Sequence, residues 1–331
     1  MRFSVGYSTR ETDAFLSELI VCKEHIHEVY MSWGDMPSGR SEGAQARTLT
    51  EWERYQKQTD DLCRLSAAGV PINLLFNANC YGEQTLSRDF YTRVGDTVAY
   101  VASASHLRSV TTTSPVIAKF IKQNFPSIDV RASVNMGIGS VQAMKYVTSS
   151  FDSFYIKREL NRNIRALREI RAFCDENGKQ MYLLANSGCL AECPAHTFHD
   201  NLVAHERAAM RMDNAYAFEG LCREYLGQPN RRDAFVKDTT FIRPEDVHFY
   251  EDLTPAMKLA TRVSDCPLTI LRAYVRGRFS GNLLTLLEPN HAMLLSPWIL
   301  DNRRISSQMQ QEQLTYFAED AFIRPQEDCL C

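Results

Sequence analysis

The stretch "PINLLFNA" (residues 71–78) is followed by "DFYTRVGDTVAYVASAS" (89–105) and then by "LRSVTTTS" (107–114). The first and third segments are short and rich in apolar or β-branched residues, which is typical of buried strands. The middle segment is longer, and its apolar residues recur at the spacing of an amphipathic helix. Together the three segments predict a strand, a helix and a second strand that pack as one βαβ unit.

The same alternation of a short apolar run and a longer amphipathic run continues along the chain, in about eight units. The other predicted strands are residues 2–7, 27–33, 128–136, 151–160, 179–187 and 256–262. A doubly wound open sheet would need a glycine-rich phosphate-binding turn after its first strand, and "GYSTRETD" (6–13) is not one. We therefore expect an α/β fold of the (β/α)₈ TIM-barrel type.

The barrel is predicted to occupy residues 1–278. The seventh and eighth predicted strands are separated by more residues than one helix needs, so residues 188–253 form a predicted insertion. From residue 279 onward the alternation stops. We expect residues 279–331 to be a C-terminal extension that packs on the barrel rather than a second domain.

Composition and charge limit the possible functions. The 331 residues carry a formal net charge of -3, and the sequence pI is about 6.3. A large nucleic acid is less expected as a partner, because it would need clustered Lys and Arg. No stretch is apolar for long enough to span a membrane, and the N-terminus lacks the pattern of a secretory signal. We expect a cytoplasmic protein that acts on a small molecule or a peptide, and a protein partner is a further candidate.

Polar side chains gather where the predicted strands end. In a (β/α)₈ barrel the loops after the strands meet at one mouth, where active sites lie. The predicted catalytic residues are charged side chains near these ends: Arg40, Arg158, Glu159, Lys258 and Arg262. The predicted cofactor-binding residues are amides at the same ends: Asn77, Asn135 and Asn186. A solvated polar rim is the alternative interpretation for any one of them.

The segment "NSGCLAECPAH" (186–196) begins where the seventh predicted strand ends, and it carries Cys189 and Cys193. In a reducing compartment, the ten cysteines of the chain indicate thiols, metal ligands or redox groups rather than disulfides. On a helical turn this spacing would place both sulfur atoms on one face. Both would then be within reach of one metal centre.

Two kinds of metal centre are compatible with these residues. Zinc would use the cysteine pair with two of the nearby histidines, which are His196, His199 and His205. An iron–sulfur cluster needs four ligands, usually thiolates. The further candidate thiols are Cys80, Cys222, Cys266, Cys329 and Cys331. Unligated loop thiols, or one cysteine acting as a nucleophile with a histidine base, are the remaining interpretations.

Five segments have an order and spacing found in one known family. They are "HEVYMSWGDMPSGR" (27–40), "VRASVNM" (130–136), "YIKRELN" (155–161), "AECPAHTF" (191–198) and "FIRPEDVHFYEDLTPAMKLATR" (241–262). Taken together they resemble the collagenase-like peptidase family, class U-32. Within that family the likeness is nearest to the iron–sulfur anaerobic hydroxylase branch that assists ubiquinone synthesis. It spans residues 1 to about 278 of the predicted barrel.

The resemblance implies an oxygen-sensitive 4Fe-4S cluster held by four cysteines at the barrel mouth. Cys189 and Cys193 match the family's close pair, and Cys222 falls where one branch places a later ligand. The loop "WGDMPSG" (33–39) has no cysteine, although one branch draws a ligand from the matching loop. Cys80 is therefore expected as the fourth ligand, with Cys266, Cys329 and Cys331 as alternatives.

Three functions follow from the resemblance. The first is an iron–sulfur enzyme of oxygen-independent hydroxylation or related redox modification, in which the charged mouth residues orient an anionic substrate. The second is a peptidase, although the sequence has no clear nucleophile with its base and no HExxH zinc motif. The third is a cluster-bearing partner protein without catalysis of its own.

Overall fold

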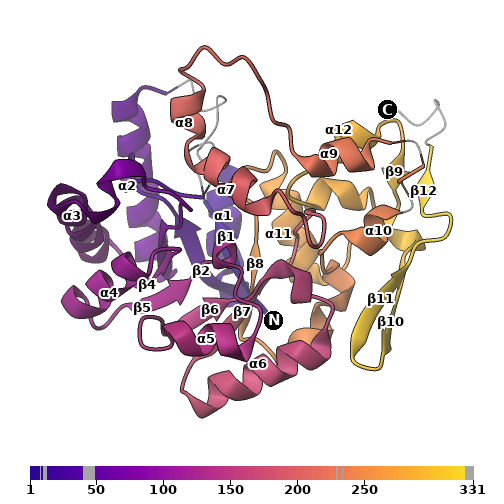
Figure 1. Ribbon diagram of the computed structural model, residues 1–331, viewed down its shortest axis with the longest axis horizontal. Helices are drawn as coiled ribbons and strands as arrows, with labels where there is room; N and C mark the ends of the chain where they lie inside the picture. The colour runs from indigo at the N-terminus through magenta and orange to yellow at the C-terminus, as the bar shows by residue number, and fades with distance from the viewer. Residues whose placement is uncertain (8, 10–12, 40–48, 229, 233, 325–331) are drawn as a thin grey trace.

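The computed structural model describes residues 1–7, 9, 13–39, 49–228, 230–232 and 234–324. Eight parallel strands close into a barrel in the order of the sequence, and β8 pairs with β1 (Figure 1). The strands are β1 (Arg2–Gly6), β2 (Ile26–Met31), β3 (Ile72–Phe76), β4 (Leu107–Thr112), β5 (Asp129–Ala132), β6 (Ser153–Tyr155), β7 (Gln180–Leu184) and β8 (Ala256–Leu259). The predicted (β/α)₈ TIM-type barrel is therefore confirmed.

Helices between the strands cover the outside of the barrel. They are α1 (Asp13–Val21), α2 (Glu51–Ala67), α3 (Arg88–Ala104), α4 (Pro115–Asn124), α5 (Val141–Val147), α6 (Ile164–Glu176) and α11 (Pro267–Arg276). Capping residues determine where several of these helices begin. Before α2, the Thr50 side chain accepts a hydrogen bond from the Glu53 N–H, while the Glu53 carboxylate accepts one from the Thr50 N–H. This capping box pairs backbone groups that the first helical turn leaves open.

Short 3₁₀ helices lie at several strand ends and in the tail. They are η1 (Lys23–His25), η3 (Gly82–Leu86), η4 (Val134–Met136), η5 (Arg158–Leu160), η6 (Pro244–Tyr250), η7 (Leu283–Leu286) and η8 (Asn302–Arg304). Two of them replace the ends of longer predicted strands. Within the predicted strand 151–160, only β6 is extended, and η5 forms the second part of the range. Within the predicted strand 128–136, β5 is extended and η4 forms the second part. Arg158 and Asn135 therefore lie in loops beyond the strands.

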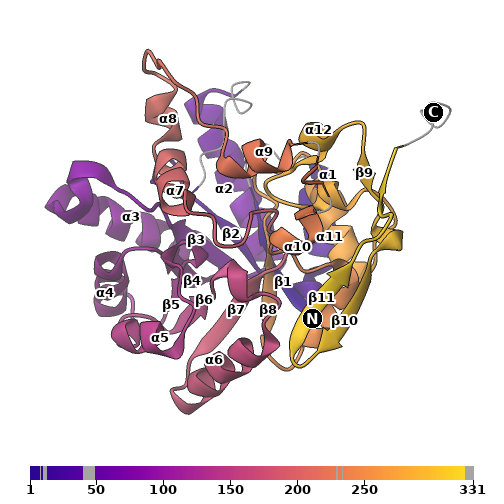
Figure 2. The same cartoon turned by 45° about the vertical axis from the view of Figure 1, so that its right-hand side comes forward.

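The chain between β7 and β8 forms a group of short helices, which stand over one end of the barrel (Figure 2). They are α7 (His196–Ala204), α8 (Glu206–Ala209), α9 (Leu221–Leu226) and α10 (Ala234–Asp238). These helices occupy the predicted insertion. Among the described residues, no helix has both the length and the apolar character needed to cross a membrane.

The chain after α11 lies against the outside of the barrel (Figure 1). Its elements, besides η7 and η8, are α12 (Ala292–Leu295), β9 (Ile299–Leu300), β10 (Ser306–Gln310), β11 (Gln313–Phe317) and β12 (Phe322–Ile323). β10 and β11 form an antiparallel hairpin. The hairpin is held at the start of α6, because the Ile164 N–H donates to the Glu312 carbonyl and the Leu314 N–H donates to the Arg162 carbonyl, both at 2.8 Å.

A buried ion pair occupies the interior of the barrel, where branched aliphatic side chains are usual for this fold. Glu28 from β2 and Arg131 from β5 form the pair, and both are at most 1% exposed. The Glu28 carboxylate also accepts hydrogen bonds from other strands, through Ser4, Asn73 and Ser109. Burial alone would raise the pKa of Glu28, but the charge of Arg131 and these hydrogen bonds lower it. The pair is therefore charged at neutral pH.

Candidate functional site

A cavity of about 80 Å³ lies at the carboxyl end of the strands, and we call it the mouth cavity. Three cationic side chains line it: Arg158 after β6, Lys258 in β8 and Arg262 after β8. Their exposed fractions are only 7%, 7% and 6%. Two predicted amides, Asn77 and Asn135, also line this cavity. The structure thus brings together five of the residues that were predicted from the strand ends.

The loop after β2 forms one wall of the mouth cavity. The Gly39 N–H donates a hydrogen bond to Asn77 Oδ1 at 3.0 Å. A Cβ atom at Gly39 would lie 2.9 Å from Asn77 Nδ2 and 3.0 Å from Asn135 Nδ2. Only glycine fits here, because the backbone passes both amides too closely for a side chain. Arg40, the next residue and a predicted catalytic one, lies outside the described residues.

Lys258 has an unusual environment for an amine. Its Nζ lies 4.2 Å from the ring centroid of Tyr30 and 5.1 Å from that of Tyr155. Within the described part of the chain, no hydrogen bond or ion pair joins this amine to another residue. Burial, followed by the charge of Arg262, lowers the pKa of Lys258 to about 7. A substantial fraction of the amine is therefore neutral at neutral pH.

Arg158 connects the mouth cavity with a cysteine. Its Nη1 donates a hydrogen bond to Cys189 Sγ at 3.1 Å, and its Nε is buried without a hydrogen-bond partner among the described residues. Burial by itself lowers the pKa of Arg158, but the charges of Cys189 and Asp200 outweigh it and raise the pKa. A buried N–H without a partner is costly. A ligand oxygen in the cavity would satisfy it.

Cys189, Cys193 and Cys222 lie close enough to interact electrostatically. Burial, followed by the charge of Cys189 and with a smaller effect of Cys193, raises the pKa of the Cys222 thiol to about 11. The helical turn expected for Cys189 and Cys193 is wrong. Residues 189–193 form a loop of turns, and α7 begins only at His196. Glu192 in this loop has a φ of 53°, which is not the right-handed helical conformation.

The other predicted thiol ligands do not join this cysteine group. Cys80 follows β3, and its Sγ accepts a hydrogen bond from the Gly82 N–H at 3.4 Å. Cys266 precedes α11 and is exposed. Cys329 and Cys331 lie outside the described residues. The eight described cysteines form no disulfides with one another.

The predicted metal centre is incomplete in the part of the chain that the structure describes. No group of three or more His, Cys, Asp or Glu side chains there could hold a metal ion. His196, a candidate zinc ligand, instead pairs with Glu159 at 3.8 Å and with Asp200 at 3.6 Å. Glu159, a predicted catalytic residue, is thus turned toward α7 and does not line the mouth cavity. The described thiols and imidazoles do not fit a full ligand set for zinc or a cluster.

Asn186, a predicted cofactor-binding residue, forms hydrogen bonds with backbone groups of the protein itself. Its Nδ2 donates to the carbonyl groups of Ala260 and Leu286, and its Oδ1 accepts from the Ala260 N–H at 2.6 Å. These bonds tie the loops after β7 and β8 to the C-terminal extension. The amide is therefore used by the protein's own backbone.

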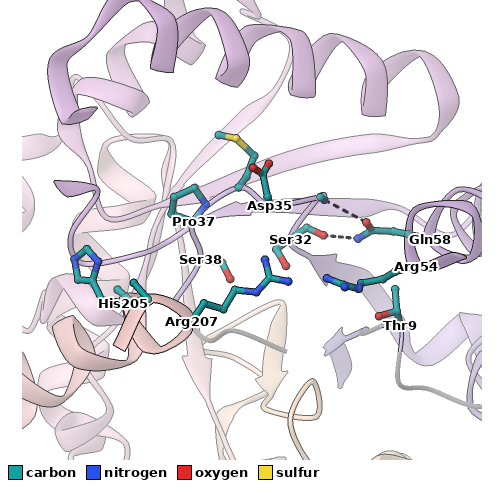
Figure 3. A pocket seen from close by; sticks show the side chains of 13 residues that line it. Thr9, Ser32, Asp35, Pro37, Ser38, Arg54, Gln58, His205 and Arg207 are labelled. Atoms are coloured by element: carbon teal, nitrogen blue, oxygen red, sulfur yellow. Dashed lines mark hydrogen bonds between the residues drawn. The ribbon is translucent and has the colours of Figure 1, made fainter. Parts of the chain in front are cut away.

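A second cavity, of about 200 Å³, lies between the loop after β2, α2 and α8 (Figure 3). The guanidinium groups of Arg54 from α2 and Arg207 from α8 point into it (Figure 3). Ser38 lines this cavity, and its hydroxyl accepts a hydrogen bond from Arg262 Nη1 at 3.2 Å. Because Arg262 lines the mouth cavity, the two cavities are neighbours that share the wall formed by Ser38 and Arg262.

Four titratable residues around the mouth cavity were not predicted: Tyr30, Tyr155, Asp200 and Glu288. Tyr30 lies two residues after Glu28 in β2, so the alternation of a strand places both side chains toward the barrel interior. Glu28 and Tyr30 are two polar residues at alternate positions of an apolar run, and this pattern could have indicated polar side chains inside the barrel. Asp200 and Glu288 come from the insertion and the extension, where no local pattern indicates contact with the mouth.

Comparisons with known proteins place this geometry in context. No family model matches the chain. An uncharacterized protease of Methanocaldococcus jannaschii is 22% identical over 260 residues, which are 76% of this chain and 75% of that protein. The solved structure of a U32 peptidase is similar with a TM-score of 0.55 and 15% identity, over 78% of this chain and 91% of that chain. The U32 peptidase structure shows that the two chains share a fold.

Proposed function

We propose that this chain is an enzyme whose mouth cavity binds a small molecule or a peptide through a carboxylate. One observation carries the proposal: three buried cations, Arg158, Lys258 and Arg262, line a single small cavity. Among the described lining residues, only two acids, Asp200 and Glu288, oppose them. An anion would relieve the repulsion between the cations, and it would offer an acceptor to the Arg158 Nε–H.

The size of the cavities limits the ligand. About 80 Å³ corresponds to roughly five to eight water positions, which is room for a carboxylate and a few attached atoms. A longer ligand would extend past Ser38 into the second cavity, where Arg54 and Arg207 present further positive charge. The relation to the U32 peptidases and the protease relative support a peptide as such a longer ligand.

The residues of the mouth cavity divide into two roles. Arg158 and Arg262 keep their charge and would hold the carboxylate with paired N–H donors. Lys258 has a pKa of about 7, which is the range in which a side chain can both accept and return a proton during turnover. The site thus suits an enzyme that orients an anionic substrate beside a group that transfers protons.

Calorimetric titration with oxalate tests the proposal. An anion in the mouth cavity favours the ammonium form of Lys258 and raises its pKa, so binding at about pH 8 should take up protons from the buffer. The observed enthalpy should then depend on the ionisation enthalpy of the buffer. Arg262→Gln should weaken oxalate binding at least about tenfold, because a charged hydrogen-bond donor is lost.

The control for this titration is Arg272→Gln. Arg272 is exposed on α11 and pairs with Glu18 of α1, away from the mouth. It carries the same charge as Arg262, so it controls for the general effect of removing a cation. Equal oxalate binding by the wild type and by both variants, without proton uptake, would contradict the proposed anion site.

A second candidate function is an iron–sulfur redox enzyme, such as an oxygen-independent hydroxylase. The observation that favours it is the hydrogen bond from Arg158 to Cys189, which brings the cysteine group next to the mouth cavity. A 4Fe-4S cluster at this place would need Cys189, Cys193 and Cys222 together with a fourth thiol, and the described thiols do not form such a set. Peptidase activity at the same mouth is the alternative, and it needs no cluster.

Anaerobic purification separates these candidates. A brown protein with about four irons per chain would support the redox enzyme or a cluster-bearing partner without its own catalysis. Cys193→Ala should then lose the colour, while Cys174→Ala, at a buried position of α6, should keep it. A colourless or zinc-loaded wild type would contradict both cluster functions and leave the peptidase.

A further inference from the structure

We propose that Lys258 is a nucleophile that forms an imine with the carbonyl carbon of a small 2-oxo acid bound in the mouth cavity. This inference rests on the proposed carboxylate binding and adds a covalent step to it. It assigns a substrate class to the cavity: a carboxylate with a carbonyl group on the next carbon.

The position of Lys258 carries the argument. Its side chain is 7% exposed and reaches the cavity from the last residues of β8. Its Nζ lies over the rings of Tyr30 and Tyr155, and the Tyr30 hydroxyl is already used as a donor to the Leu259 carbonyl at 2.8 Å. Contact with an aromatic face leaves the lone pair of the neutral amine available to form a bond. The amine is therefore held in place without being consumed by a structural ion pair with a described residue.

The charges around Lys258 favour the reactive form of the amine. The titratable and charged groups that face it or share its cavity are Glu28, Tyr30, Arg131, Tyr155, Arg158, Asp200, Arg262 and Glu288. Burial is the main cause that lowers the pKa of Lys258 to about 7, and the arginines add to it while Glu28 opposes it. The neutral amine is the nucleophilic form. A large fraction of the molecules is thus reactive at neutral pH.

The two arginines define which carbonyl compound fits. Arg158 and Arg262 line the same cavity as Lys258, so a carboxylate held by their guanidinium groups has its neighbouring carbon next to the amine. The volume of about 80 Å³ admits only a few atoms beyond the carboxylate. A 2-oxo acid carries the carboxylate and the carbonyl on adjacent carbons and meets both requirements. Pyruvate is the simplest probe of this class.

The covalent step is balanced without an oxidant or a reductant. The Nζ lone pair forms a bond to the carbonyl carbon. The carbonyl oxygen leaves as water, with one proton from the amine and one from solvent. The product is a protonated imine, whose positive charge lies beside the carboxylate of the same ligand.

Reductive trapping tests this step. Sodium cyanoborohydride reduces a protonated imine but leaves the ketone, so wild-type protein incubated with pyruvate and this reagent should gain one stable adduct. Its mass should be that of pyruvic acid less one oxygen atom, and peptide mapping should locate it on Lys258. The trapping rate should fall as the pH is lowered through the pKa that Lys258 has beside bound pyruvate, because the amine then becomes protonated; the bound carboxylate raises this pKa above the value of about 7 in the free protein.

Two lysine variants sharpen the test. Lys258→Met should give no adduct. Lys157→Met should give the wild-type adduct, because Lys157 lies in the loop after β6 and pairs with Glu192 at 3.6 Å instead of lining the cavity. Mapping of the wild-type adduct gives the same answer without a substitution, so the test does not depend on the folding of Lys258→Met.

The outcomes separate the imine from the anion site. If oxalate binds in calorimetry but pyruvate is not trapped, or is trapped only on other lysines, the imine is overturned and the anion site stands. If neither oxalate nor pyruvate binds, the proposed carboxylate site fails and the imine fails with it. A single adduct on Lys258 that oxalate suppresses supports both.

Discussion

Replacing Lys258 with methionine should change how the stability of the protein depends on pH. The folded barrel keeps this amine buried beside Arg262, and burial is the largest of the causes that lower its pKa from 10.5 to about 7. In the unfolded chain the ordinary pKa returns. Below about pH 7 the amine is protonated in both states; between there and about pH 10.5 the unfolded state binds more protons. The free energy of unfolding contributed by Lys258 therefore rises with pH across this window.

The size of the effect follows from the pKa. The difference between 10.5 and about 7, at about 1.4 kcal/mol per pH unit, corresponds to about 5 kcal/mol over the whole window. From about pH 6 to about pH 9 only part of the window is crossed, and the expected gain is about 3 kcal/mol. Methionine keeps a long unbranched side chain in the site but has no proton to release. The variant should lack this gain.

Urea unfolding followed by circular dichroism at several pH values measures the effect. The difference in unfolding free energy between the wild type and Lys258→Met should move by about 3 kcal/mol in favour of the wild type between about pH 6 and about pH 9. Lys119→Met, at an exposed position of α4, should follow the wild type. A difference between the wild type and Lys258→Met that stays constant with pH would refute the reasoning.

Three further substitutions have defined outcomes. Glu28→Gln removes the buried carboxylate beside Arg131 and leaves Asp129 as the remaining carboxylate partner of this cation, so it should lower the free energy of unfolding by about 3 kcal/mol in urea titrations; an unchanged midpoint would argue against the ion pair. Gly39→Ala places a Cβ 2.9 Å from Asn77 and should weaken oxalate binding in calorimetry while the circular dichroism spectrum stays that of the wild type. Thr50→Ala removes the capping box of α2 and should lower stability by about 1 kcal/mol in thermal unfolding, an effect that Thr50→Ser should largely restore.

The order of strands and helices could be predicted because each strand is a short apolar run bounded by polar residues. The residues at which the strands end could not be predicted in this way. The predicted strand 151–160 stops as β6 at Tyr155, since the Asn161 side chain bonds to the carbonyl groups of Leu184 and Thr240 and holds the following turn toward β7 and the insertion. Such contacts join residues far apart in the sequence, so no local pattern contains them.

The candidate site could be predicted only where one rule governs it. Residues at strand ends face one mouth in this fold, and this rule placed Arg158, Lys258 and Arg262 in one cavity. The rule cannot say which polar residues near a strand end turn elsewhere, as Asn186 and Glu159 do. The conformation of the cysteine segment could not be predicted either: the spacing suggested a helical turn, and residues 189–193 form a loop.

A crystal structure of the protein grown with oxalate tests the proposed anion site most directly. We predict oxalate in the mouth cavity, with its oxygen atoms within hydrogen-bonding distance of the guanidinium groups of Arg158 and Arg262 and of the Lys258 amine. Oxalate bound only between Arg54 and Arg207 in the second cavity, with none at the mouth, would contradict it.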